Sequence, residues 1–134
     1  MLFSSLFNWK LFLIPFITVV NFLLFILSVY YLKKCINPFI KSDFYSSIVI
    51  KNLKKSGGIF VFIGVSTIFF RFISVVYIIN SVPMQGLSWF SFIAFISSID
   101  ISTIFLIIIG LFFLLFSNAF ENAKSLKQEN DLTI

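Results

Sequence analysis

Two residues of opposite charge, Arg71 and Asp100, are the first candidates for chemistry, because they are the only charged residues between Lys55 and Glu121. A charge inside a long apolar stretch is costly, so it usually pairs with an opposite charge, reaches water, or marks a path for an ion or ligand. The sequence therefore leaves three interpretations open: a structural ion pair, two side chains that reach water separately, and a role in transport or sensing.

Other side chains that perform catalysis or bind metals are scarce. The chain has no His and a single cysteine, Cys35, which excludes a disulfide within the chain, a Cys/His zinc site and a His-based triad. It also lacks a Gly-rich phosphate loop, a pair of catalytic carboxylates and a cluster of metal ligands. We therefore expect no catalytic residue, no metal and no cofactor, and we interpret the protein as one that is not an enzyme.

The composition indicates that lipid surrounds most of the chain. Of the 134 residues, 60% are hydrophobic and only 11% are charged, which would leave a water-soluble domain without enough polar surface to cover itself. Three apolar runs, at about 11–32, 58–82 and 99–120, are each long enough to cross a hydrocarbon core of about 30 Å. The sequence thus predicts an all-α fold, a single membrane domain over 1–134 with three transmembrane helices.

The distribution of lysines predicts the orientation in the membrane. A basic loop, 33–57, joins spans one and two, and a tail, 121–134, follows span three and adds Lys124 and Lys127, whereas Lys10 alone lies on the other side. Because basic residues gather on the cytoplasmic side, loop and C-terminus are expected in the cytoplasm and the N-terminus outside. The loop lysines are Lys33, Lys34, Lys41, Lys51, Lys54 and Lys55. We interpret them as contacts to the lipid bilayer, not as direct contacts to nucleic acid.

The basic loop also contains a helical pattern. Within 43–56, five apolar residues fall on one side at 100° per residue, with Lys51, Lys54 and Lys55 opposite, and Ser42 and Asp43 precede the pattern as N-cap residues. This arrangement predicts an amphipathic helix on the inner membrane surface, ended by Gly57 and Gly58. The five apolar residues are Phe44, Tyr45, Ile48, Val49 and Leu53.

Small residues recur at four-residue intervals at Ala94, Ser98 and Ser102, which predicts a face of span three that packs closely on another helix. Beyond Phe120, the segment "ENAKSLKQEND" is expected to continue span three as a polar helix in the cytoplasm. Two interpretations of its last residues stay open. They form a solvated end, or they dock onto the chain's own inner face or onto a partner.

The tail resembles the closing signature of a bacterial membrane family known as domain of unknown function 2975. The segment is "LKQENDLTI", and the residues that carry the likeness are Leu126, Glu129, Asn130, Asp131, Leu132, Thr133 and Ile134. The segments "NPF" and "IVIKNLKKSG" resemble the loop of that family. Members usually have four spans, whereas this chain offers three, with Met1 to Trp9 where the first would end, so the N-terminus is either shortened or assigned to a late start codon.

The resemblance implies a small integral protein of the bacterial cytoplasmic membrane, without known enzymatic activity and often encoded beside a helix-turn-helix transcriptional regulator. We therefore interpret the chain as a membrane partner or sensor that works with such a regulator, and a cytoplasmic regulator protein is the expected partner. A small oligomeric pore or a transporter accessory subunit is the alternative. Both interpretations leave open whether the chain forms a homo-oligomer.

Overall fold

The computed structural model is all-helical in the part of the chain that it describes, residues 9–81, 93, 96–97 and 100–132. Helix α1 runs over Trp9–Ile40, α2 over Ser47–Ser81 and α4 over Ile101–Leu132. Each contains a stretch long and apolar enough to cross a membrane. The predicted all-α class and the presence of three long apolar helices able to span a membrane are therefore confirmed.

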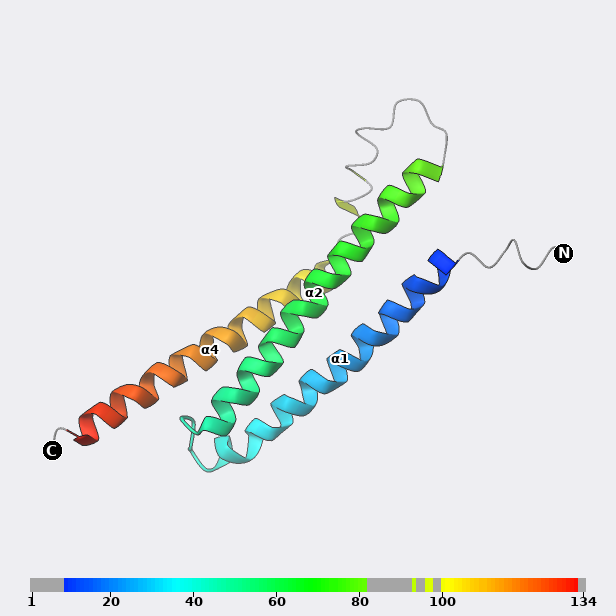
Figure 1. Cartoon of the computed structure of the whole chain (residues 1–134). Helices are drawn as coiled ribbons and strands as arrows, with labels where there is room; N and C mark the ends of the chain where they lie inside the picture. The colour runs from blue at the N-terminus through cyan, green and yellow to red at the C-terminus, as the bar shows by residue number, and fades with distance from the viewer. Residues whose placement is uncertain (1–8, 82–92, 94–95, 98–99, 133–134) are drawn as a thin grey trace.

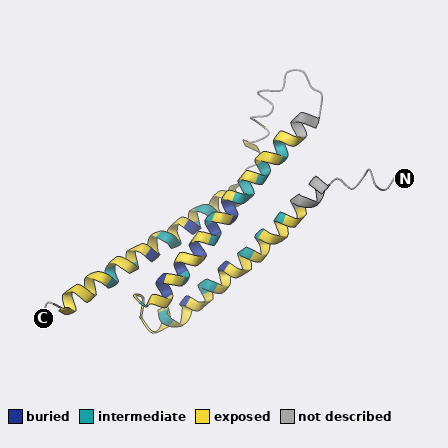
Figure 2. Ribbon diagram, in the orientation of Figure 1, coloured by how far each residue is buried: buried dark blue, intermediate teal, exposed yellow. Residues whose placement is uncertain are grey.

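Helix α2 is the centre of the bundle and lies between α1 and α4, with both neighbours antiparallel to it (Figure 1). In the described residues, α1 and α4 share no close backbone contact, and they meet only through side chains such as the rings of Phe39 and Phe120. Figure 2 shows that most of the ribbon is exposed, with the buried positions gathered where the helices meet. Exposed Phe, Ile and Leu side chains on all three helices fit a lipid environment, because a chain this apolar has no other way to cover its surface.

The connection between α1 and α2 is a short turn with defined hydrogen bonds. Ser42 adopts a left-handed conformation, with φ at 55°, and its amide donates to the carbonyl of Phe39 while the amide of Asp43 donates to that of Pro38. These are the two bonds of a Schellman motif, which ends α1 with a serine where glycine is usual. Ser46 then caps α2, because its side-chain oxygen accepts the amide of Val49 at 3.3 Å.

The separate amphipathic helix expected over 43–56 is not supported. Residues from Ser47 onward are the first turns of the apolar α2, and the helix passes through Gly57 and Gly58 without a break. The reason is packing: Val49 and Leu53 are buried with Cys35 of α1 and against Phe113 and Phe120 of α4, so this segment belongs to the bundle. The predicted caps at Ser42 and Asp43 are wrong for the same reason, since α2 begins at Ser47 after its cap at Ser46.

Helices α2 and α4 meet along a seam of mostly small residues, spaced seven apart on each helix. The facing pairs are Ile50 with Ser117, Gly57 with Gly110, and Gly64 with Thr103. Ser117 donates its hydroxyl hydrogen to the carbonyl of Ile50 at 2.9 Å, and all six residues are buried. We call these six residues the α2–α4 seam. Small residues let two membrane helices approach closely and gain dispersion contacts along their backbones.

The centre of the seam has no room for a side chain. A Cβ built on Gly57 would lie 2.7 Å from the carbonyl oxygen of Gly110, and one built on Gly110 would lie 2.8 Å from that of Gly57. The small-residue face predicted for span three is wrong at the residue that the structure describes: Ser102 is exposed, and its neighbour Thr103 is buried in the seam. Ala94 and Ser98 lie outside the described residues.

Helix α1 is held to α2 by polar contacts. The hydroxyl groups of Ser28 and Ser56 lie 2.7 Å apart in a fully buried position. Seven residues before Ser28, the amide nitrogen of Asn21 donates to Thr67 at 3.2 Å, and its amide oxygen accepts from Ser66 at 3.3 Å. These contacts fix the rotation of α1 and provide polar groups with partners away from water.

Candidate functional site

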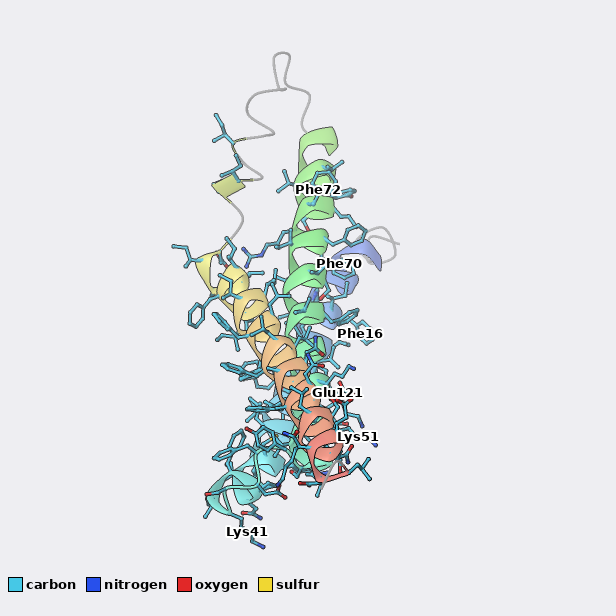
Figure 3. All side chains as sticks on the ribbon, turned by 90° about the vertical axis from the view of Figure 1, so that its left-hand side faces the viewer. Phe16, Lys41, Lys51, Phe70, Phe72 and Glu121 are labelled. Atoms are coloured by element: carbon cyan, nitrogen blue, oxygen red, sulfur yellow. The ribbon has the colours of Figure 1, made fainter. Side chains whose placement is uncertain are left out.

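The lysines of the predicted loop gather at one end of the bundle, which we call the basic end. Lys33 and Lys34 lie on α1, Lys41 in the turn, and Lys51, Lys54 and Lys55 on α2, all exposed. Figure 3 shows Lys41, Lys51 and Glu121 towards this end and Phe70 and Phe72 far from it. The opposite end of the bundle is called the distal end below.

Three of the lysine ammonium groups have partners in the structure. The Nζ atom of Lys34 lies 4.6 Å from the ring centroid of Tyr30, and that of Lys55 lies 5.2 Å from the ring centroid of Tyr31. The Nζ atom of Lys54 lies 4.0 Å from a carboxylate oxygen of Glu121 on α4. Tyrosine and lysine together are typical of a membrane–water interface, where an aromatic ring meets the hydrocarbon and a cation meets the headgroups.

The tail continues α4 as a helix to Leu132, as the sequence predicts. In Figure 1 this part of α4 extends away from α1 and α2. Leu126 is 62% exposed and Leu132 is 86% exposed, so the described part of the tail is not docked on the chain's own inner face. On the same helical segment Lys127, Glu129, Asn130 and Asp131 are exposed and Lys124 is half-buried, whereas Thr133 and Ile134 lie outside the described residues.

Arg71 and Asp100, the two isolated charges, are brought together at the distal end. The guanidinium Nη2 of Arg71 donates a hydrogen bond to the carboxylate Oδ2 of Asp100, and the two side chains are 34% and 53% exposed. Asp100 directly precedes α4, and its backbone carbonyl accepts from the amides of Thr103 and Ile104 in the first helical turn. A carboxylate at a helix N-terminus is favoured by the helix dipole.

The hydrogen bond from Arg71 lowers the pKa of Asp100 below its ordinary value; desolvation opposes this lowering, and the positive charge of Arg71 adds to it. Asp100 is therefore ionised at neutral pH, and the pair is a salt bridge between α2 and α4. The partial exposure of both side chains places the pair at the edge of the bundle, where either group can also contact water.

The two ion pairs between α2 and α4 bracket an apolar segment. Lys54 and Arg71 are seventeen residues apart on α2, or about 25 Å, and Asp100 and Glu121 are twenty-one residues apart, or about 30 Å. These lengths are close to the thickness of a hydrocarbon core, about 30 Å. The ion pairs between α2 and α4 therefore lie at levels that suit the two surfaces of a bilayer.

A pocket of about 260 Å³ lies between α1 and α2 next to Arg71. Its lining residues are Ile17, Thr18, Asn21, Thr67, Phe70, Arg71 and Ser74. A second, larger pocket of about 430 Å³ lies near the basic end and is lined only by apolar residues and Cys35, with contributions from all three helices. The distal pocket is thus the one that combines polar groups with a charge.

Among the described residues, no group of three or more His, Cys, Asp or Glu side chains lies close enough together to hold a metal ion. Cys35 is buried, with its Sγ 3.6 Å from the carbonyl oxygen of Tyr31 and 3.9 Å from that of Val49.

The sequence reasoning missed the α2–α4 seam, although a signal was present. Gly57 and Gly64 are seven residues apart, as are Thr103, Gly110 and Ser117, and this spacing is that of a helix seam. The polar contacts of Asn21 and Ser28 were not predicted as pairs, because single polar residues in a span do not show which residues they face.

A bundle of apolar helices, with charges at its two ends and polar contacts inside, defines a multi-pass α-helical membrane protein. The chain belongs to the family described as protein of unknown function (DUF2975), whose model matches residues 5–134, nearly its whole length. The family resemblance of the tail is thereby confirmed. No curated protein and no solved structure matches the chain.

Proposed function

We propose that the protein is a membrane-anchored partner of a cytoplasmic regulator protein, which it holds at the inner surface of the bacterial cytoplasmic membrane. The observation that carries this proposal is the extension of α4 beyond the bundle, a helix exposed as far as Leu132. A short helix in water gains little stability on its own, so a segment of this kind is well suited to gain its packing from another protein.

The orientation follows from the charges. The basic end carries six lysines on α1, the turn and α2, and the tail of α4 adds Lys124 and Lys127 at the same end. Cytoplasmic segments of membrane proteins are rich in lysine, so the basic end and the C-terminus belong in the cytoplasm. The docking segment then faces the compartment in which a transcriptional regulator works.

The regulator suggested by the family resemblance provides the test. A helix-turn-helix regulator of the kind that the resemblance implies is co-expressed with the full chain, with a chain that lacks Asp131 to Ile134, and with the double variant Leu126→Ser and Leu132→Ser. The regulator should sediment with membranes that contain the full chain and stay in the supernatant with both variants. Lys51→Gln is the control, because it removes an exposed charge from the basic end but leaves α4 intact. Equal sedimentation with all four chains, at equal levels of inserted protein, would refute docking through the tail.

Cysteine labelling tests the orientation independently. In a Cys35→Ala background, a membrane-impermeant thiol reagent added outside should label a cysteine at position 85 and leave cysteines at positions 42 and 128 unlabelled until the membrane is opened. Labelling of position 42 from outside would reverse the orientation.

The alternative function, a small oligomeric pore, receives less support from the geometry. Asn21, Ser28, Ser56, Ser66 and Thr67 form hydrogen bonds between α1 and α2. Their polar groups are thus used inside one chain and do not present a continuous polar face for a channel.

A further inference from the structure

Five of the seven side chains that line the pocket at the distal end are polar. It is formed by α1 and α2, while Asp100, the partner of Arg71, comes from the start of α4. Arg71 is therefore shared between the pocket and the salt bridge. Most of the surface of the pocket is apolar, and its few polar groups can fix the orientation of an occupant, as they do in ligand pockets generally.

The hydrogen-bond inventory of the pocket indicates which chemistry it would take. The hydroxyl hydrogens of Thr67 and Ser74 are already donated to the carbonyls of Ile63 and Phe70, at 2.7 and 2.9 Å. The side-chain nitrogen of Asn21 carries two hydrogens, and among the described residues it donates only to Thr67. Asn21 thus has a second amide hydrogen to donate in the pocket, and Arg71 brings a guanidinium that already donates to Asp100.

A group with two or more acceptor oxygens and a negative charge complements these donors. Carboxylate and phosphate are the two common groups of this kind, and arginine binds both in a planar, forked geometry. A neutral acceptor such as a carbonyl oxygen would gain a hydrogen bond from Arg71 but no charge attraction, and a cation would be repelled. The donors therefore select an oxyanion.

We propose that the pocket between α1 and α2 binds the carboxylate or phosphate group of a small anion, which competes with Asp100 for Arg71. Binding draws the guanidinium towards α1 and releases the start of α4 from α2 at the distal end. Asp100 can then be solvated, because its side chain is already half exposed. The anion comes either from the water outside the membrane or from the headgroup of a bilayer lipid.

The consequence for the cell rests on the proposed function, whereas the binding site does not. In a protein that anchors a regulator, an anion that releases α4 from Arg71 acts on the same helix that extends beyond the basic end. Anion binding would then be the stimulus that α4 transmits. If the regulator does not dock, the measurement below still tests the anion site, because it does not involve the regulator.

The experiment uses the full chain in a phosphate-free neutral detergent, with inorganic phosphate as the probe and chloride at matched ionic strength as the reference. Thermal unfolding is followed by the reaction of the buried Cys35 thiol with a fluorogenic reagent. Phosphate should raise the unfolding temperature in a saturable manner. Arg71→Gln should abolish the shift, and the control Lys127→Gln, which removes an exposed tail charge, should leave it unchanged.

The decisive variant is Asp100→Asn, which removes the competing carboxylate and keeps the shape of the side chain. It should tighten phosphate binding by about threefold or more, the order of magnitude expected for removing one nearby negative charge even in water. If instead Asp100→Asn weakens binding, or if phosphate shifts all variants alike, the competition for Arg71 does not exist and the proposal is overturned. A wild-type chain without any saturable shift, in either arm below, overturns it as well.

A second arm identifies the source of the anion. The same variants are reconstituted in bilayers of phosphatidylglycerol and compared with the detergent samples. A saturable shift with free phosphate or acetate in detergent assigns the site to a small soluble anion. A shift that appears only with phosphatidylglycerol, and that Arg71→Gln abolishes, assigns it to a lipid headgroup.

Discussion

Two adjacent glycines allow a sharp test of the α2–α4 seam. Gly57 faces Gly110, whereas a Cβ added to Gly58 would meet nothing within 4 Å. Replacement by Ala improves helix propensity equally at both positions, by up to about 1 kcal/mol. Only at Gly57 does the new methyl group contact the opposing backbone, so the difference between Gly57→Ala and Gly58→Ala isolates the packing of the seam.

The size of the effect follows from the distances. The methyl group at position 57 would lie 2.7 Å from the carbonyl oxygen of Gly110, where ordinary contact begins at 3.4 Å. The obstacle is backbone, which cannot rotate away as a side chain can, so α2 and α4 must separate. Overpacking of this kind costs about 1 to 3 kcal/mol. We therefore expect Gly57→Ala to destabilise the bundle by about 1 to 2 kcal/mol and Gly58→Ala to be neutral or stabilising.

The assay is reversible unfolding of the full chain in mixed micelles of SDS and neutral detergent. The readout is the reactivity of the Cys35 thiol, which is 3% exposed and packs with Val49 and Leu53 of α2. Gly110→Ala should behave like Gly57→Ala, because its methyl group meets the backbone of Gly57 at 2.8 Å. Equal unfolding free energies for Gly57→Ala and Gly58→Ala would show that α2 and α4 do not approach as closely as the seam requires.

Three further predictions follow from single contacts. Ser42→Gly should stabilise the bundle by about 0.5 to 1 kcal/mol in the same unfolding assay, because φ at 55° is unfavourable for a residue with a Cβ, and a loss of stability would refute the left-handed turn. A double-mutant cycle of Ser28→Ala and Ser56→Ala should give a coupling energy of about 0.6 to 1.7 kcal/mol, and a value of zero would mean that the buried hydroxyl pair does not join α1 to α2. The pKa of Asp100 is lower in the folded chain than its ordinary value of 3.8. The salt bridge therefore adds its full contribution to the free energy of unfolding above about pH 3.8, and this contribution is lost as the pH falls through the pKa of the folded chain. The free energy of unfolding, measured from pH 2 to 5, should show this loss in the wild type and not in Asp100→Asn. Identical pH profiles for the two chains would refute a contribution of the salt bridge.

The membrane-spanning helices could be predicted from the sequence because lipid imposes a simple rule on composition. Apolar runs of about 20 residues must be helical where no water is present to satisfy the backbone, and each of the runs predicted at 11–32, 58–82 and 99–120 falls mainly on one of the three helices. The ends of the helices were harder to predict. Helix α2 begins at Ser47, eleven residues before the predicted span, because Lys51, Lys54 and Lys55 direct their charges outward while Val49 and Leu53 pack inside.

The site could be predicted only in its parts. The isolation of Arg71 and Asp100 in the sequence pointed to a pair, because opposite charges in an apolar segment have few other partners. Neither the pocket beside Arg71 nor the role of Asn21 could be derived, since both depend on how α1 is rotated against α2. That rotation is fixed by Ser28 and Ser56, whose contact no periodicity in the sequence reveals.

The α2–α4 seam also explains why the charge pair forms where it does. On α2, Arg71 follows Gly64 by seven residues and thus continues the line of Ile50, Gly57 and Gly64. On α4, Asp100 lies directly before the helix that presents Thr103 to Gly64. A slip of α4 by one helical turn would move it by about 5.4 Å, which is enough to break the salt bridge. Backbone contact between Gly57 and Gly110 therefore sets the register in which Arg71 meets Asp100, and a change at the glycines acts on the charged site about 20 Å away along α2.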